Sequence, residues 1–334
     1  MGKITNLKSL LSIVLCLCSF AVTTIIGHQL FLIKRNFNDL HNKIVTMIPA
    51  SKDSYLAFFA NPVNQHTVDH YVLYHNLKPW VQDAKKAEII FAGNSKTLYA
   101  FDIPKFKELM QPINLNLYNL GFQQAEGWGF TKVLLEKYDL RPKILIINGE
   151  EFFPRPPSGF AQYVMSQSRF SAWKSVFEDE MCFNTMISIH RFAYFPYWLT
   201  TDGGRAKFRS LTNGSWRWGF KIPGLQPTVF DPNYEWPEKP RQAIISIAKE
   251  FKDFLTARDT QLIMTWIPKE IPSNFSEVKA IADANDIPLV TVSNEDLFTF
   301  DHDHLHWDSG TLFTERLVAK LKKNTVFMNA LMKD

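Results

Sequence analysis

Histidine and aspartate are concentrated in one short stretch near the C-terminus, where residues 301–308 hold three of each. Asp301 is followed by His304 with two residues between them, and Asp303 and His306 repeat this spacing. An imidazole can take a proton from a serine hydroxyl, and a carboxylate beside it fixes the imidazole tautomer. The stretch therefore offers two members of a serine-dependent catalytic site, and the serine must come from another part of the chain.

The same histidines allow two other interpretations. His302, His304 and His306 alternate along the chain, so the three imidazoles would share one face of an extended strand. Three imidazoles can hold a zinc ion with a fourth position open. The stretch is also consistent with a solvated polar loop. We favour the catalytic interpretation, and we expect neither a metal nor a cofactor.

Short apolar runs alternate with amphipathic segments from residue 87 onward. Most of the runs are continuously apolar, although 113–121 alternates polar and apolar residues, and this is typical of a parallel sheet that helices cover on both faces. The runs expected to be strands are 87–95, 113–121, 143–153, 261–268 and 287–293. We therefore predict an α/β fold, a three-layer sandwich with a central parallel sheet.

Polar residues follow three of these runs. In open parallel sheets, functional groups gather beyond the carboxyl ends of the strands. The apolar part of the first run gives way to Ser95, that of the second to Asn119 and Gly121, and that of the third to Asn148. The 301–308 stretch follows the last run, so we expect it to meet Ser95 at the same edge of the sheet.

These residues resemble the motif blocks of the SGNH (GDSL-type) hydrolases and acyltransferases. Gly93-Asn94-Ser95 is similar to the Gly-Asp-Ser block that carries the nucleophile, and Asp301-x-x-His304 is similar to the last block. The resemblance implies that Ser95 attacks an acyl carbonyl, that His304 is the base and that Asp301 orients it. It also implies an SGNH or flavodoxin-like arrangement of the sandwich.

The spacing alone leaves the choice of histidine open. Asp303 and His306 form the alternative catalytic pair. We prefer His304, because Ser309 and Gly310 then stand where the family has small residues that open the next helix. Sequence spacing does not fix the direction of a side chain, so both pairs remain candidates here.

The resemblance also implies donors for the oxyanion. The backbone N–H groups of Ser95 and Gly121 are two of them, and each such donor contributes roughly 3–4 kcal/mol to transition-state stabilisation. The side-chain donor is expected to be Asn148, with Asn119 as the second candidate. The third block departs from the family pattern Gly-x-Asn-Asp, and we interpret Glu150 within it as a solvated or helix-start charge.

The resemblance is strongest to membrane-anchored members that modify cell-envelope polymers. It implies an O-acyltransferase or esterase, with a polysaccharide hydroxyl, an acyl donor and a membrane-bound O-acyltransferase as partners. Transfer is favoured over hydrolysis, because a tethered domain can receive acyl groups at the membrane surface. The alternative is a non-catalytic SGNH-shaped partner of an integral-membrane acyltransferase or polysaccharide-export complex.

The N-terminal part predicts a membrane anchor. Residues 9–33 contain no Asp, Glu, Lys or Arg, and about 20 apolar residues suffice to span a bilayer core. We expect an uncleaved single-pass anchor at 1–35, a juxtamembrane linker at 36–86 and the catalytic domain at 87–330. Flanking charges do not fix the orientation, and the resemblance places the domain outside the cytoplasm. An aromatic-rich insertion is expected at about 154–240.

Composition limits the remaining possibilities. The net charge is +4 and the basic residues are scattered, which excludes a nucleic-acid binding surface of the usual kind. Cys182 is the one cysteine outside the apolar span, so no disulfide can form within the rest of the chain. Trp216 and Trp218 in the insertion are candidates for stacking on sugar rings, with ordinary packing as the alternative.

Overall fold

The computed structural model describes residues 53–60, 65–123, 126–193, 206–217, 238–269, 275–299 and 301–333. The expected anchor at 1–35 lies outside these residues. Within them, no helix combines the length and apolar character that crossing a bilayer requires. Trp218 and much of the expected insertion also lie outside the described part of the chain.

The centre of the molecule is a parallel sheet of five strands. Its order is β4-β3-β5-β8-β9, and every neighbouring pair is parallel. The strands are β3 (Ile89–Gly93), β4 (Leu117–Gly121), β5 (Ile144–Asn148), β8 (Gln261–Thr265) and β9 (Leu289–Val290). Counted in chain order this is the 2-1-3-4-5 arrangement of flavodoxin-like folds, in which ligands bind beyond the carboxyl ends of the strands. The predicted central parallel sheet is confirmed.

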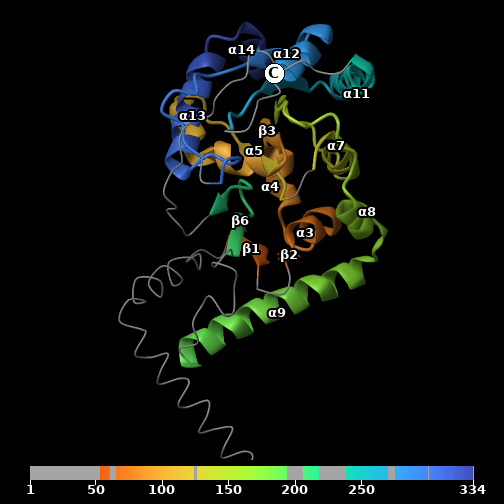
Figure 1. Cartoon of the computed structure of the whole chain (residues 1–334), viewed down its shortest axis with the longest axis vertical. Helices are drawn as coiled ribbons and strands as arrows, with labels where there is room; N and C mark the ends of the chain where they lie inside the picture. The colour runs from red at the N-terminus through yellow and green to blue at the C-terminus, as the bar shows by residue number, and fades with distance from the viewer. Residues whose placement is uncertain are drawn as a thin grey trace, which may run out of the picture.

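Helices cover both faces of this sheet (Figure 1). All residues of β3, β4 and β5 are buried, and alternate side chains enter two separate apolar clusters. The first cluster contains residues of α3 (Asp69–His75), α4 (Val81–Lys86), α7 (Trp128–Lys137), α11 (Glu238–Thr256) and α12 (Phe275–Ala284). The second contains residues of α6 (Ile103–Leu109), α13 (Trp307–Leu321) and α14 (Thr325–Met332).

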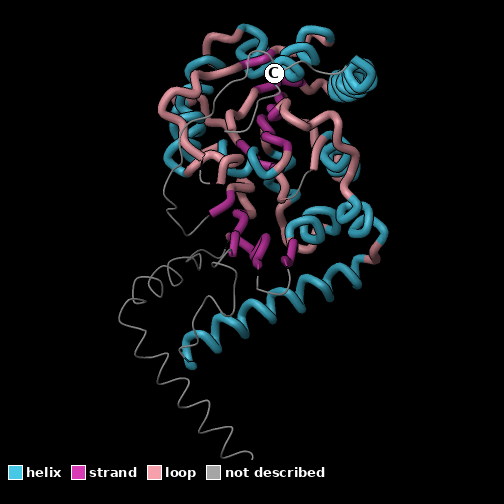
Figure 2. The backbone as a smooth tube through the Cα atoms, viewed as in Figure 1, coloured by secondary structure: helices cyan, strands magenta, loops and turns pink. Residues whose placement is uncertain are grey.

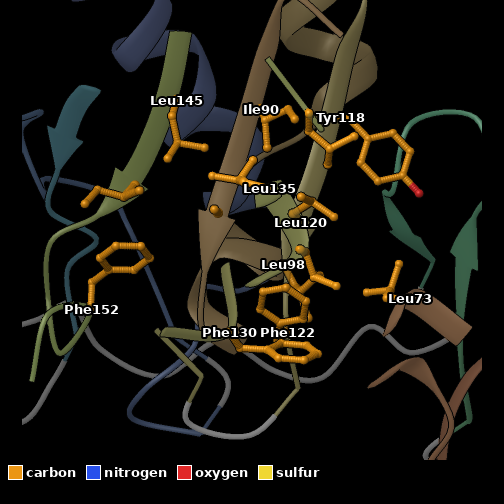
Figure 3. Packing of buried hydrophobic residues seen from close by; sticks show 14 of the residues in the cluster. Leu73, Ile90, Leu98, Tyr118, Leu120, Phe122, Phe130, Leu135, Leu145 and Phe152 are labelled. Atoms are coloured by element: carbon orange, nitrogen blue, oxygen red, sulfur yellow. The ribbon is translucent and has the colours of Figure 1, made fainter. Parts of the chain in front are cut away.

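The first cluster shows why the strands read as continuous apolar runs. Figure 3 shows Ile90, Leu120 and Leu145, from three adjacent strands, on the same side as Phe130 and Leu135 of α7. The intervening strand residues face the other cluster, so both faces of each strand exclude water. This double coverage is what a three-layer sandwich requires.

A second, antiparallel sheet was not predicted. Its order is β2-β1-β6-β7, and Figure 2 shows it as a separate group of strands below the central sheet. The strands are β1 (Ser54–Ala60), β2 (Gln65–Thr67), β6 (Ala206–Ser210) and β7 (Trp216–Arg217). The expectation of a linker up to residue 86 is therefore wrong for residues 53–60 and 65–86, because β1, α3 and α4 bury apolar side chains in the first cluster.

A buried arginine joins the two sheets. Arg209 on β6 lies 2.9 Å from Asp69 on α3, and neither side chain is exposed. The Arg209 guanidinium also donates to the carbonyl of Gly121, at the carboxyl end of β4. The small sheet is thereby held against the strand end that borders the candidate site.

The described part of the insertion is mostly helical. It contains α8 (Gly159–Ser166) and the long helix α9 (Arg169–Ala193), which packs against α3 and is drawn in green in Figure 1. One face of α9 is buried through Ala172, Val176 and Phe183. Trp173 on the same helix is about half exposed and stacks between Phe170 and Phe177.

Candidate active site

Ser95 is the first residue of α5 (Ser95–Ala100), and only Asn94 separates it from the carboxyl end of β3. The turn depends on Gly93, whose φ is +146°. A Cβ at this position would lie 2.4 Å from Oγ1 of Thr97, so a side chain does not fit. Asn94 then caps the helix, because its side chain accepts a hydrogen bond of 3.1 Å from the backbone N–H of Lys96.

The structure brings Ser95 and His304 together. Oγ of Ser95 lies 2.6 Å from Nε2 of His304, and the residues are 209 positions apart in the sequence. The other ring nitrogen of His304, Nδ1, lies 2.7 Å from Oδ2 of Asp301. The hydroxyl, imidazole and carboxylate therefore form one continuous chain of hydrogen bonds, which is the arrangement that activates a serine.

Asp301 also holds the turn that carries the histidine. Its Oδ1 accepts the backbone N–H groups of Asp303 at 3.2 Å and His304 at 2.8 Å. Burial opposes ionisation of this carboxyl, but the hydrogen bond and charge of His304 outweigh it, so the pKa of Asp301 is lowered below its usual range. Both carboxylate oxygens of Asp301 are thus hydrogen-bonded within the 301–304 turn.

Backbone conformation explains how the turn points the imidazole. His302 adopts φ +67°, a left-handed conformation that is uncommon for residues other than glycine. Thr299 and Leu305 form an antiparallel bridge on either side of it, and Leu305 is buried in the second apolar cluster. The turn is closed at its base, and His304 projects from it toward α5.

The alternative catalytic pair is placed elsewhere. His306 is the N-cap of α13, and its Nδ1 accepts the backbone N–H of Asp308 at 3.4 Å. The Asp303 carboxylate lies 2.9 Å from Nζ of Lys96 and is not paired with His306. Of the two pairs with the same spacing, the structure places the one containing His304 against Ser95.

The zinc interpretation requires three imidazoles on one face, and the turn prevents this. His304 contacts Ser95 and Asp301, whereas His306 caps a helix. Among the residues that the structure describes, no group of three His, Cys, Asp or Glu side chains is arranged to hold a metal ion.

Two of the expected oxyanion donors are already engaged. The backbone N–H of Gly121 donates to Oδ1 of Asn119 at 2.8 Å, and Nδ2 of Asn119 donates to the carbonyl of Thr97 at 3.2 Å. The expectation that Gly121 offers a free N–H is therefore wrong, because Asn119 is buried two residues earlier on the same strand and takes that hydrogen. Asn119 itself serves to join β4 to α5.

Asn148 differs from Asn119 in this respect. Its Oδ1 accepts the backbone N–H of Ile267 at 3.1 Å, while its Nδ2 is buried without a hydrogen-bond partner. Asn148 ends β5 next to β3, and its backbone N lies 3.9 Å from the position of a Cβ on Gly93. Two residues before it, Ile146 faces the second cluster, as do α13 and Leu305. The alternation of a strand gives Asn148 that same face.

Four charged residues surround the nucleophile segment. Lys96 and Glu150 are buried, and Lys96 Nζ donates to Oε2 of Glu150 at 2.6 Å. The expectation that Glu150 is solvated is wrong, since its side chain is inaccessible and also pairs with Lys269. Burial disfavours the charge of Lys269, but the Glu150 carboxylate prevails and raises the pKa of Lys269. We call these three residues, together with the partly exposed Asp303 that pairs with Lys96, the buried ion cluster.

Sequence reasoning missed Tyr99. Its ring lies 4.8 Å from the His304 imidazole, edge to face at 74°. Tyr99 follows Ser95 by four positions on α5, so helical spacing places both on one face. The four-residue spacing of Ser95 and Tyr99 is the sequence signal that could have indicated Tyr99 as a residue of the site.

A cleft of about 370 Å³ opens beside Tyr99. Its lining includes Tyr99, Trp216 and Trp307 together with polar groups such as Asn213 and Thr311. Trp216 is only 4% exposed and packs edge to face on Tyr99, so it offers no free ring face for a sugar. Trp307, 51% exposed, is the accessible indole of this cleft.

Comparisons with known proteins give no family assignment. No family model matches the chain, and no curated protein matches it. Among solved structures, a chain from Bacteroides fragilis assigned as an acylhydrolase is 14% identical, with a TM-score of 0.33, and covers 77% of this chain and 98% of its own. A GDSL-like lipase from Bacteroides thetaiotaomicron is 12% identical, with a TM-score of 0.32, and covers 79% and 98%. Likeness at this level does not establish a shared activity.

Proposed function

We propose that the protein is a serine-dependent O-acyltransferase or carboxylesterase of SGNH type. The observation that carries this proposal is the chain of hydrogen bonds from Ser95 through His304 to Asp301. A serine hydroxyl is a weak nucleophile unless a base accepts its proton, and this arrangement supplies the base and the group that orients it.

The geometry suggests the following steps. Ser95 Oγ attacks the carbonyl carbon of an ester, and His304 Nε2 takes the hydroxyl proton. The tetrahedral intermediate collapses when His304 returns that proton to the departing alcohol, which leaves an acyl group on Ser95. A second hydroxyl, from water or from a sugar, then gives its proton to His304 and attacks the acyl carbonyl. The bond from the acyl group to Ser95 Oγ breaks, and His304 returns the proton to Ser95 Oγ, which restores the free enzyme.

The oxyanion of the intermediate needs fixed donors. We assign this role to the backbone N–H of Ser95 and to Nδ2 of Asn148. Gly121 is left out because its N–H is bound to Asn119. Asn148 is supported by its buried donor, which has no partner, and by its position beside Gly93.

The finer proposal concerns substrate and location. The uncharged span at 9–33 supports a single-pass anchor, and with it an acyl donor delivered at a membrane surface. The cleft beside Tyr99 combines the indole of Trp307 with polar side chains, which suits a sugar ring better than a lipid chain. We therefore propose transfer to a hydroxyl of a cell-envelope polysaccharide, with a membrane-bound O-acyltransferase as the partner that supplies acyl groups.

Labelling with a fluorophosphonate, followed by mapping of the adduct, tests the nucleophile. We expect attachment at Ser95 in the wild-type protein and none in Ser95→Ala or His304→Ala, whereas His306→Ala should label normally. Turnover of 4-nitrophenyl acetate should fall by roughly 10³–10⁶ in the two inactive variants. Absence of any Ser95 adduct in the wild-type protein would instead favour a non-catalytic partner of an acyltransferase complex.

Hydrolysis and transfer are separated by adding an acceptor. If transfer dominates, a soluble oligosaccharide should accelerate consumption of the acyl donor and become acylated. If the protein is an esterase, the released acyl group should appear as free acid whether or not the oligosaccharide is present.

A further inference from the structure

The buried ion cluster connects the same two segments that carry the nucleophile and the base. Lys96 immediately follows Ser95, and Asp303 immediately precedes His304. Nζ of Lys96 lies 2.9 Å from Oδ1 of Asp303 and 2.6 Å from Oε2 of Glu150. The ion pair is therefore a second tie between α5 and the 301–304 turn, alongside the Ser95–His304 contact.

The charges of the cluster are balanced. The cluster contains two lysines and two carboxylates. Lys96 pairs with one oxygen of Glu150, and Lys269 pairs with the other. The Lys96 side chain is 2% exposed and the Glu150 side chain is fully buried. Moving such charges out of water is costly, and well-packed apolar residues often stabilise a fold as well or better. Stability alone is therefore a weak reason for a charged cluster at this position.

The conformation of the 301–304 turn provides a better reason for the charged cluster at this position. His302 holds a left-handed conformation, which is uncommon for a residue other than glycine and depends on restraint from its surroundings. Asp303 is restrained on both sides, since its N–H bonds Asp301 and its carboxylate meets Lys96. Loss of the ion pair between Asp303 and Lys96 would remove one of these restraints from the 301–304 turn, which directs His304 toward Ser95.

We propose that Lys96 is a positioning residue that fixes the 301–304 turn through Asp303 while Glu150 and Lys269 hold its ammonium group in place. This inference rests on the proposed function, because it concerns the alignment of the proposed base. Lys96 moves no proton and contacts no reacting atom. Its contribution is to keep His304 Nε2 within hydrogen-bond distance of Ser95 Oγ, and a small misplacement there lowers the rate strongly.

The test compares Lys96→Met, Asp303→Asn and the double variant. Asp303→Asn keeps the shape of the side chain and removes its charge, and its partly exposed position favours normal folding. In Lys96→Met, Glu150 retains its pair with Lys269. We expect kcat for 4-nitrophenyl acetate to fall roughly 10- to 100-fold with KM within about twofold. The double variant should be no slower than Lys96→Met, because both changes remove one interaction.

Two further variants show whether the charge pair is responsible. Asp303→Glu retains the carboxylate and should recover most of the lost rate. Lys105→Met removes a lysine of α6 that pairs with Glu108 and Glu315 away from the turn, and it should leave kcat unchanged. If Lys96→Met and Asp303→Asn keep the wild-type kcat, the inference is wrong.

Amide hydrogen exchange separates this inference from the proposed function. Loss of the ion pair should accelerate exchange across residues 301–305, with the central strands unchanged. Faster exchange in the variants, together with a wild-type protein that never labels at Ser95, would retain the positioning role and reject the enzyme. Unchanged exchange in the variants, together with a wild-type protein that labels at Ser95, would reject the positioning role alone.

Discussion

The ring of Tyr99 meets the imidazole of His304 edge to face, with 4.8 Å between the ring centroids. Tyr99 lies one helical turn after Ser95, so α5 supplies both the proposed nucleophile and a wall against the proposed base. The contact limits rotation of the imidazole ring about its Cβ–Cγ bond. An active site of this kind needs such support, because a base must stay within hydrogen-bond reach of the proton that it removes.

Replacement of Tyr99 should therefore affect the rate more than the binding of a small ester. We expect Tyr99→Leu to lower kcat by about tenfold with little change in KM, since the imidazole loses a packed neighbour. Tyr99→Phe keeps the ring and should lie closer to the wild-type protein. Steady-state kinetics with 4-nitrophenyl acetate measure both, and equal losses in the two variants would point to the hydroxyl.

Asn148 offers a substitution that keeps its accepting oxygen and shape while replacing its donor with an ionisable carboxyl oxygen. Asn148→Asp retains the oxygen that accepts the Ile267 N–H and removes Nδ2, the proposed oxyanion donor. The expected result is a loss of about 10²–10³ in kcat, the usual effect of removing one such donor. The thermal midpoint should be recorded alongside. A variant that folds normally and keeps its kcat would remove Asn148 from the oxyanion site.

Acid should weaken the fold partly through Asp301. Because the pKa of Asp301 is lowered in the folded protein, its ionised form contributes stability above the ordinary carboxyl pKa of 3.8. This contribution is lost as the pH falls through the lowered pKa. The difference in free energy of unfolding between the wild-type protein and Asp301→Asn should therefore be largest near neutral pH and shrink below about pH 4. Denaturant titrations at several pH values measure it, and a difference independent of pH would contradict the assignment.

Gly93 should tolerate no side chain. A Cβ there would meet Oγ1 of Thr97 at 2.4 Å, and the φ of +146° is unfavourable for any other residue. We expect Gly93→Ala to lower the free energy of unfolding by about 1–3 kcal/mol and to reduce labelling of Ser95. Gly159→Ala is the matched control, because no atom lies within 4 Å of its Cβ position. Equal stability of the two variants would show that the Gly93 turn can adapt.

The central sheet was predictable because its signals are local. Most of the buried strands are continuous apolar runs, and the polar residues that end or follow such runs reach one edge in any parallel sheet. The antiparallel sheet was not predictable in the same way. Its main pairing joins β1 to β6, which are separated by more than a hundred residues, and neither strand carries a distinctive pattern.

The sequence indicated which types of residue could form the site. Which of the candidate residues contact one another depended on the fold. Asp301 and Asp303 stand at identical spacing from a histidine, so the choice between them came from the turn and its left-handed His302. Lys96 and Glu150 are 54 positions apart, and no sequence signal joins them. The engagement of Gly121 by Asn119 is local, but it depends on a side-chain direction that spacing does not fix.

The order of the chain has a consequence for the protein as it is being made. Ser95 leaves the ribosome 209 residues before His304, an interval of roughly 10–40 s at ordinary rates of translation. Throughout that interval the hydroxyl has no partner to deprotonate it, whatever part of the sheet has already folded. A nascent or prematurely terminated polypeptide that lacks His304 would consequently lack the proposed activity, and the proposed chemistry could begin only after His304 has been synthesised.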